Sequence, residues 1–480
     1  MYKIVEGSTH GRSEVSRLVD LLNSPSDGLG DYFGGKGDIF IARAPGRLDV
    51  MGGIADYSGS LVLEMPIAEA VIAAVQKGEN RKIVIRSLSR NRYEDLEFEI
   101  STSDLVGADH EAARKIFSAG RSTHWAAYVA GVFPILSREC GFEFHSGARI
   151  LISSDVPPGK GVSSSAALEV ATMQAVCAAF DIEVEARRMA MLCQKAENLV
   201  VGAPCGVMDQ VTSCCGVENA LISLLCQPAE IQEIVQIPRG LEFWGIDSGV
   251  RHAVTGSDYA SVRVAAFMGY RIIAEAAGLN VRELGNGLVE IDDDRWQGYL
   301  SNISPAKYES EFLAEIPERI TGADFIARYG GITDRVTKIH PVRTYKVRAA
   351  AEFPIFENDR VSRFGKLLQG QDVLTHLDQL GELMFASHAG YEACGLTEEG
   401  TERIVELVRE RTSDGLFGAR ITGGGSGGTV AVIGESGART AVDAVAHQYA
   451  EETGREPSIF SGSSRGCAAF GHLRMRFETD

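Results

Sequence analysis

Three glycine-rich clusters constrain this chain more than any other feature of its sequence. They are RAPGRLDVMGGIADYSG at 43–59, PPGKGVSSSA at 157–166 and TGGGSGGT at 422–429. Glycine adopts positive φ without steric cost and lets the main chain approach a ligand closely. The chain must therefore fold around three irregular loops. Its 53 glycines show no G-X-Y period, which excludes a collagen-like helix.

The second cluster has the clearest chemistry. Gly159 and Gly161 precede three consecutive serines, and an Ala-rich segment expected to be helical follows at 165–180. Serine hydroxyls cap helix N-termini, and glycines let backbone N–H groups converge, so the segment predicts a phosphate site at a helix N-terminus. The alternative is a capped helix after a turn. Lys160 is followed by Gly161 rather than Ser or Thr, so this is not a Walker A loop.

The third cluster satisfies both the G-x-G-x-x-G and the G-x-S-x-G patterns, the latter around Ser426. A dinucleotide-binding turn and a nucleophile elbow each need a helix after the loop, whereas a strand is expected here at 429–433. A further G-x-S-x-G match at 462–466 lies in loop-like sequence. We therefore interpret the third cluster as a loop whose backbone approaches phosphates or another loop.

Charge and cysteine usage exclude several classes of function. The 65 acidic and 47 basic residues leave a net charge of −18, which disfavours binding to nucleic acid or to an anionic membrane. No apolar run is long enough to span a bilayer, and the N-terminal segment lacks the apolar core of a signal peptide. The nine cysteines form no C-x-x-C pair, so we expect reduced thiols in a cytoplasmic protein.

The pattern of elements favours an α+β fold, because strands and helices are mixed without strict βαβ alternation. Strands are expected at 38–44, 61–65, 70–75, 148–153, 220–225, 241–247 and 429–433. A second helix is expected at 188–199, and the acidic stretch at 290–295 is expected to be a surface loop. A domain boundary is expected within 228–240.

The three clusters, taken in this order, resemble the motifs of the GHMP small-molecule kinases. The first cluster resembles the sugar-binding signature of the galactokinase branch, and PCGVMDQ at 204–210 resembles its catalytic segment. The chain is most similar to the kinase portion of plant-type L-arabinokinases, in stretches such as CQKAENLVVGAPCGVMDQ, FWGIDSGVRH and HAGYEACGL. The resemblance spans residues 38–472 and leaves the first 36 residues outside it.

The resemblance implies a two-domain α+β GHMP kinase fold. Its N-terminal domain is similar to ribosomal protein S5 domain 2, its C-terminal domain is ferredoxin-like, and the active site lies between them. We place these domains at 1–236 and 237–480 and assign no role to a leader at 1–36. The sequence carries no signal for an oligomeric state.

The resemblance also implies an ATP-dependent sugar 1-kinase that uses Mg²⁺. Candidate site residues follow from their positions in the motifs of the family. Asp209 is the candidate base and Arg47 its neighbouring cation; whether such a carboxylate is a true base or an electrostatic stabiliser stays open. The implied metal ligands are Ser165 and Glu197. The implied nucleotide contacts are Gly159, Lys160, Gly161, Val162, Ser163, Ser164, Ser165, Gly424 and Gly425. The implied sugar contacts are Asp56, Gly53, Ile54, Gly206, Asp209 and Tyr259, the last lying eight residues after Arg251.

Two of these positions depart from the galactokinase pattern, which has Glu-His where this chain has Gly53-Ile54. In that family the pair lies toward the 6-hydroxymethyl group of galactose, a group that L-arabinose lacks. A pocket without polar groups for an absent hydroxyl suits the pentose, because no buried group is left unpaired. Asp49, where galactokinases usually carry Asn, is a further departure to which we assign no role.

The sequence therefore favours an L-arabinokinase, with galactokinase as the nearest alternative. A non-catalytic sugar sensor of the same family is a second alternative, although the retained catalytic set argues against it. A serine hydrolase is disfavoured, because His252 and His388, the histidines nearest the matching segments, are both expected to be structural.

Overall fold

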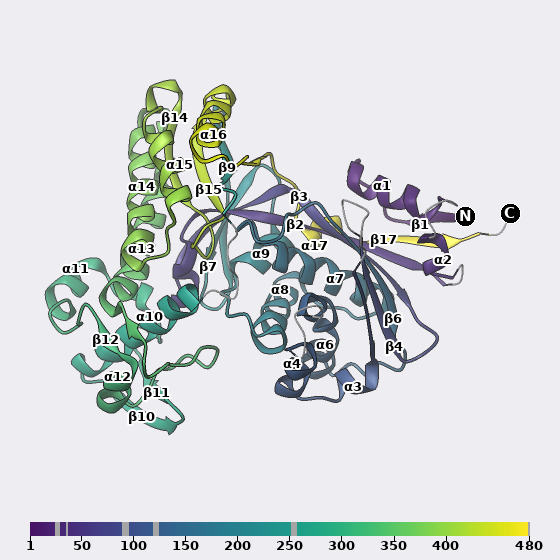
Figure 1. Cartoon of the computed structure of the whole chain (residues 1–480), viewed down its shortest axis with the longest axis horizontal. Helices are drawn as coiled ribbons and strands as arrows, with labels where there is room; N and C mark the ends of the chain where they lie inside the picture. Colours follow the sequence, from purple (N-terminus) through teal and green to yellow (C-terminus); the bar gives the residue numbers. More distant parts are fainter. Residues whose placement is uncertain (25–28, 35–36, 89–95, 119–123, 251–256, 479–480) are drawn as a thin grey trace.

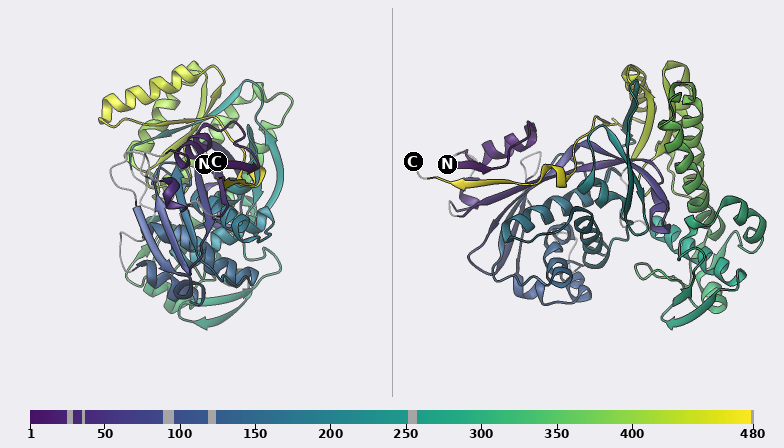
Figure 2. Two further views of the ribbon diagram at one scale, coloured as in Figure 1. Left: turned by 90° about the vertical axis from the view of Figure 1, so that its right-hand side faces the viewer. Right: turned by 180° about the vertical axis from the view of Figure 1, so that it is seen from behind.

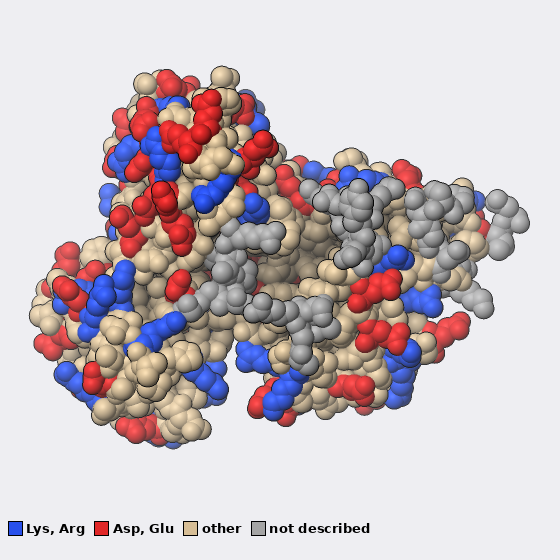
Figure 3. Space-filling model, in the orientation of Figure 1, with Lys and Arg blue, Asp and Glu red and all other residues tan. Residues whose placement is uncertain are grey.

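The computed structural model describes residues 1–24, 29–34, 37–88, 96–118, 124–250 and 257–478. Within these residues the strands form a nine-stranded sheet, a four-stranded sheet and two two-stranded sheets (Figure 1). No helix in this part of the chain combines the length and apolar character needed to cross a bilayer. On the face shown in Figure 3, acidic and basic side chains are interspersed.

The nine-stranded sheet is built mainly from the first half of the chain. Its strand order is β1 (Tyr2–Glu6), β17 (Leu473–Phe477), β2 (Ile39–Met51), β3 (Leu61–Lys77), β6 (Ala148–Ser154), β4 (Lys82–Ser87) and β5 (Leu96–Ser101). Two further strands extend it through β3, namely β7 (Ala220–Leu225) and β8 (Glu230–Gln236).

The central strands β2 and β3 of this sheet are buried along nearly their whole length. On one face, Ala42 and Ala73 pack in the core with helix α7 (Ser164–Phe180). On the other face, Ile41 and Ile72 pack with helix α1 (Ser13–Leu22). The first 36 residues, to which the sequence assigned no role, therefore supply an edge strand and a covering helix.

Several expected elements are confirmed, and others differ for identifiable reasons. The strands expected at 148–153, 220–225 and 241–247 and the helix expected at 165–180 agree with β6, β7, β9 (Leu241–Asp247) and α7 to within one residue. The strand expected at 38–44 runs on to Met51, because Pro45 and Gly46 lie at a register shift within it rather than in a turn. The strands expected at 61–65 and 70–75 form the single strand β3.

Further differences concern the second helix and the acidic stretch. The helix expected at 188–199 is α8 (Ala186–Lys195), followed by the π-helical turn η3 (Ala196–Val201). The expectation of an acidic loop at 290–295 is wrong for its first part, because β11 (Leu288–Asp292) pairs in a hairpin with β10 (Asn280–Gly285). Exposed acidic residues are compatible with a solvent-facing hairpin.

The second half of the chain forms a four-stranded sheet of order β14 (Leu416–Ile421), β15 (Thr429–Glu435), β9 and β16 (Ile459–Ser461). Helices α14 (Leu377–Cys394), α15 (Glu399–Arg409) and α16 (Arg439–Thr453) pack with it, and α10 (Ser257–Ala276) packs on α13 (Val347–Leu368). The domain boundary between residues 236 and 237 remains a proposal.

After the four-stranded sheet, the chain returns to the nine-stranded sheet through β17. This strand pairs with both β1 and β2, so the termini lie side by side (Figure 2).

Candidate active site

One pocket collects most of the residues that the sequence singled out. It is lined by Arg47, Ile54, Asp56, Gly159, Gly161, Ser163, Ser164, Ser165, Glu197, Ala203, Pro204, Cys205, Gly206, Met208, Asp209, Tyr259, Gly423 and Gly424. These residues come from all three glycine clusters and from both halves of the chain. Four predicted contacts do not line the pocket, namely Gly53, Lys160, Val162 and Gly425, and the structure gives a reason for each.

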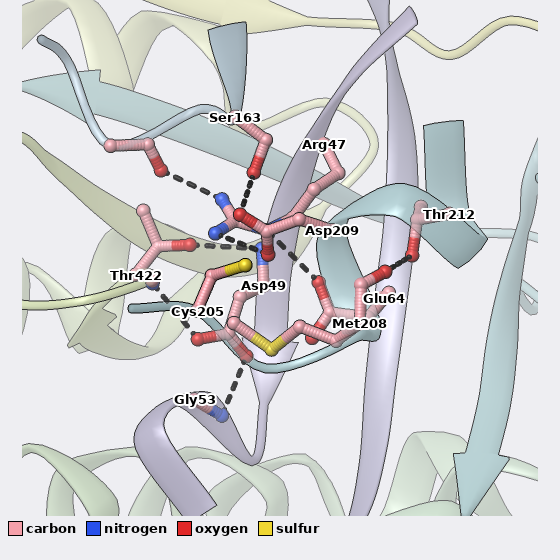
Figure 4. Close-up of polar contacts among 12 residues, drawn as sticks. Arg47, Asp49, Gly53, Glu64, Ser163, Cys205, Met208, Asp209, Thr212 and Thr422 are labelled. Carbon is pink, nitrogen blue, oxygen red and sulfur yellow. Dashed lines mark hydrogen bonds and ion pairs between the residues drawn. The ribbon is translucent and has the colours of Figure 1, made fainter. Parts of the chain in front are cut away.

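The centre of the pocket is an arginine held by carboxylates (Figure 4). Arg47 on β2 donates to Asp209 Oδ1 at 2.9 Å and to the carbonyl of Gly161 at 2.7 Å. Its Nε lies 3.3 Å from Oε2 of the fully buried Glu64. Burial opposes the charge of Arg47, but the carboxylates of Asp209 and Asp49 favour it, so the pKa of the guanidinium is raised. A fixed cation beside Asp209 results.

Asp209 is held from the opposite side by the phosphate loop. It lies in the first turn of α9 (Met208–Cys215), and its Oδ2 accepts from the hydroxyl of Ser163 at 2.5 Å. Ser163 precedes α7 with a positive φ of 58°, a strained conformation for a residue with a side chain. The sequence expectation that the serines cap the helix is wrong for Ser163, whose hydroxyl makes no capping bond because it donates to Asp209.

Glycines of the second and third clusters allow their two loops to meet. Gly159 and Gly161 both have φ of 73°, and a Cβ on Gly428 would lie 2.9 Å from the carbonyl oxygen of Lys160. Lys160 does not line the pocket, and its ammonium forms a 2.5 Å ion pair with buried Asp247. Val162 is buried in the core, and its carbonyl accepts from the backbone N–H of Arg47.

The candidate metal ligands lie together at one side of the pocket. Glu197 in η3 is buried, and burial together with Asp209 raises its pKa to about 7, although hydrogen bonds from Ser165 and Gln210 oppose the shift. Gln210 Nε2 donates to Glu197 at 2.7 Å. In the described part of the chain, no group of three or more His, Cys, Asp or Glu side chains could hold a metal. A hydroxyl and one carboxylate could serve only an ion that takes its other ligands from phosphate and water.

The opposite side of the pocket carries a carboxylate suited to hydroxyl groups. Asp56 lies in the 3₁₀ turn η1 (Gly53–Ser58), and its Oδ1 is buried without a hydrogen-bond partner among the described residues. Burial, together with Asp209, raises its pKa to about 7. A Cβ on Gly206 would lie 1.5 Å from Asp56 Oδ2, so only glycine fits there. An unpartnered buried acceptor at a pocket wall is suited to a ligand donor.

Two residues of α10 complete this side. Tyr259 lines the pocket and packs edge-on against Tyr57, with ring centroids 5.8 Å apart. Arg263, which the sequence did not single out, forms a buried ion pair with Asp334 and donates to the carbonyl of Cys205 at 3.0 Å. It thereby holds the segment that carries Gly206. Arg251 and His252 lie outside the described residues.

The expected role of Gly53 needs correction. Gly53 has φ of 54°, and a Cβ there would lie 1.8 Å from the hydroxyl oxygen of Tyr391. The space beside Gly53 is therefore filled by a side chain of α14 and is not open to a sugar, whereas Ile54 does line the pocket. In the third cluster, Gly423 lines the pocket in place of the expected Gly425, which faces Leu396.

Asp49, to which the sequence assigned no role, organises this region. Its carboxylate is fully buried, pairs with Arg420 at 2.9 Å, and accepts from the backbone N–H groups of Gly53 and Gly423. The hydroxyl of Thr422 accepts from the Asp49 N–H (Figure 4). A buried acidic residue in strand β2 was the signal in the sequence, but two of its partners, Arg420 and Gly423, lie more than 370 residues away in the chain.

His388 and Ser464, which belong to the remaining sequence motifs, make contacts within the fold. His388 is buried, and its Nδ1 accepts from the backbone N–H of Ile421. Burial, aided by Arg420 and Arg409, lowers its pKa to about 4. Ser464 is fully buried and bonds to Arg43 and to the carbonyl of Ile67. These contacts do not resemble a nucleophile with an adjacent base.

Comparisons with known proteins agree on one family. The chain matches the models for the GHMP kinases N terminal domain at 127–217, the galactokinase galactose-binding signature at 30–77 and the GHMP kinases C terminal region at 371–451. It is 44% identical over 497 aligned residues to an L-arabinokinase of Arabidopsis thaliana, covering 93% of this chain and 48% of that protein. The chain thus spans about half the length of that relative.

Two further comparisons extend over nearly whole proteins. A galactokinase of Chloroflexus aggregans is 29% identical over 428 residues, which cover 88% of this chain and 91% of that protein. The crystal structure of Lactococcus lactis galactokinase complexed with galactose superimposes with a TM-score of 0.71 and 22% identity, covering 95% and 99% of the two chains. The latter similarity establishes the shared fold.

Proposed function

This chain is a member of the GHMP kinase superfamily, and on that premise we propose that it transfers the γ-phosphoryl group of ATP to the anomeric hydroxyl of L-arabinose. The products are L-arabinose 1-phosphate and ADP. The observation that carries this proposal is a pocket in which Asp209 and Arg47 lie between a serine-rich helix N-terminus and Asp56, whose buried Oδ1 has no hydrogen-bond partner among the described residues.

The phosphate groups of ATP fit the N-terminal end of α7. This helix has 17 residues, so its dipole and its free N–H groups at Ser164 and Ser165 favour an anion. Gly159, Gly161 and Gly424 let backbone come close from both sides. Because the overall charge is −18, binding depends on these local groups and not on the field of the whole protein.

Magnesium would be held by Ser165 and Glu197. Both offer oxygen atoms, Glu197 is buried at the pocket wall, and the small number of protein ligands suits an ion that is also bound to phosphates. When bound with ATP, the ion neutralises charge on the phosphates. Gln210, which donates to Glu197, fixes the orientation of that carboxylate.

Asp209 and Arg47 act at the reacting hydroxyl. As the sugar oxygen bonds to the γ-phosphorus, the bond from that phosphorus to the leaving oxygen of ADP breaks, and the hydroxyl proton moves toward Asp209. Arg47, fixed by Asp209 and Gly161, stabilises charge on the transferring group. The transition state is loose, so positioning contributes more than full proton abstraction.

The sugar lies against Asp56, Gly206 and Tyr259, with Ile54 at the wall where a longer sugar would extend. An aliphatic wall cannot bond an additional hydroxymethyl group or a carboxylate, which favours a pentose over galactose and galacturonate. D-Galactose remains the second candidate, because the chain carries the galactokinase galactose-binding signature. The cytoplasmic location predicted from cysteine usage is kept as part of the proposal.

The deciding experiment measures ADP release with L-arabinose, D-galactose and D-galacturonate. We expect turnover to be fastest with L-arabinose, and Asp209→Asn to lower kcat by roughly 100-fold or more. Asp443→Asn, the same change at a half-exposed residue of α16, should have no effect.

Each contrary outcome has a distinct meaning. Absence of ADP release with every sugar would refute the kinase, and a preference for D-galactose would refute the assigned substrate. A sugar sensor would show a thermal shift with sugar and nucleotide without releasing ADP.

A further inference from the structure

A buried tyrosine links two of the glycine clusters that contribute residues to the pocket. The hydroxyl of Tyr391 accepts from the backbone N–H of Ile54 at 2.9 Å and donates to the carbonyl of Gly423 at 2.6 Å. Tyr391 is fully buried, and its ring packs edge-on against Phe353 and beneath the guanidinium of Arg420. The tyrosine is therefore held firmly on α14 while its hydroxyl joins two separate loops.

A second side chain makes the same connection. Asp49 accepts from the N–H of Gly53 at 3.1 Å through Oδ1 and from the N–H of Gly423 at 3.0 Å through Oδ2. The two bridges thus attach consecutive residues of one loop to Gly423 of the other. Ile54 and Gly423 both line the pocket. If either loop moves, the hydrogen bonds that Tyr391 and Asp49 make to both loops must change.

We propose that Tyr391 is a positioning residue that couples the sugar side of the pocket to its nucleotide side, an inference that rests on the proposed function. Sugar bound against Ile54 and Asp56 orders η1. Through the Tyr391 hydroxyl this order extends to Gly423 and Gly424, where nucleotide phosphates approach. Binding of one substrate then favours binding of the other by the same factor in both directions.

The position of the Tyr391 hydroxyl contributes to the requirement for glycine at position 53, where φ is 54°. A Cβ there would lie 1.8 Å from the Tyr391 hydroxyl oxygen, 2.7 Å from Nη2 of Arg420 and 2.8 Å from Cζ of Tyr391. Any side chain would displace the hydroxyl from its two partners. Gly53 and Tyr391 therefore act as a pair, in which the glycine leaves the volume that the bridging hydroxyl occupies.

The test is calorimetric titration of a non-hydrolysable ATP analogue, with and without saturating L-arabinose. In the wild type we expect sugar to tighten nucleotide binding by about fivefold or more. Tyr391→Phe keeps the ring and removes both hydrogen bonds, so the ratio should fall close to one. Tyr345→Phe is the matched control, since it removes a hydroxyl that accepts from the His340 N–H in the same hydrophobic cluster, and it should keep the wild-type ratio.

A second comparison needs no sugar. Gly53→Ala should lower the unfolding temperature sharply, and Gly53→Ala combined with Tyr391→Phe should be more stable than Gly53→Ala alone, because the nearest clashing atom is gone. Wild-type coupling in Tyr391→Phe, or no coupling in the wild type, would overturn the inference, and a double variant no better than Gly53→Ala would overturn the pairing of Gly53 with Tyr391. If the wild type phosphorylates D-galactose instead, the proposed substrate is refuted. The titration is then run with D-galactose, and its result tests the coupling independently of the substrate.

Discussion

Replacing Asp49 by asparagine tests whether the buried ion pair with Arg420 is as important as its position indicates. Both side chains are fully buried, and Arg420 Nη1 bonds to the Asp49 carboxylate at 2.9 Å. In the described part of the chain, Nε and Nη2 of Arg420 have no hydrogen-bond partner. Asp49→Asn keeps the shape of the side chain and removes its charge, so the guanidinium loses its bonded counter-charge.

The expected loss of unfolding free energy differs between the two partners, because only the carboxylate keeps other hydrogen-bond donors. Removing one member of a buried pair costs about 3–5 kcal/mol of unfolding free energy, and we expect Asp49→Asn to fall in this range. Arg420→Met should cost less, about 1–3 kcal/mol, because the carboxylate keeps the N–H groups of Gly53 and Gly423 as donors. The double variant should be more stable than Asp49→Asn alone, because no uncompensated cation remains.

Urea unfolding followed by tryptophan fluorescence measures these differences. The control is the half-exposed pair Arg439–Asp443 on α16, whose removal should leave stability unchanged within error. The reasoning would be refuted by an Asp49→Asn variant as stable as the wild type, or by a double variant whose loss equals the sum of the two single losses.

Three further predictions concern the pocket. Gly206→Ala should abolish sugar binding while nucleotide binding survives, because its Cβ would lie 1.5 Å from Asp56 Oδ2; separate titrations with sugar and nucleotide check this, and unimpaired sugar binding would contradict it. The pKa of Asp56 is raised from 3.8 to about 7 by burial, so the folded state holds this proton more tightly than the unfolded chain, and stability without ligand should fall as pH rises from about 4 to about 7. Asp56→Asn should reduce that slope in unfolding curves, and an unchanged slope would show that other groups cause it. Burial and Asp49 raise the pKa of Glu64 well above its usual range, so Glu64→Gln should preserve activity and stability; a large loss of kcat would mean that Glu64 is ionised beside Arg47.

The sequence by itself predicted the features that depend on local chemistry. Glycine clusters and consecutive serines mark loops and a helix start wherever they occur, and the boundaries of β7 and β9 follow from short apolar runs. The spaced motifs identified the family and nominated most residues that line the pocket, including Arg47, Asp209 and Asp56.

Only the tertiary structure decided which partner each of those residues meets. Ser163 was expected to cap a helix, but its hydroxyl donates a hydrogen bond to Asp209, which lies 46 residues further along the chain. Gly53 was expected to contact the sugar, but the hydroxyl of Tyr391 fills the space beside it. That hydroxyl accepts from the N–H of Ile54, which lies 337 positions away in the chain. Asp49 had no expected role until Arg420 and Gly423 were brought to it. Backbone propensity and side-chain periodicity act over a few residues, whereas these contacts form only when distant segments pack, so no local pattern encodes them.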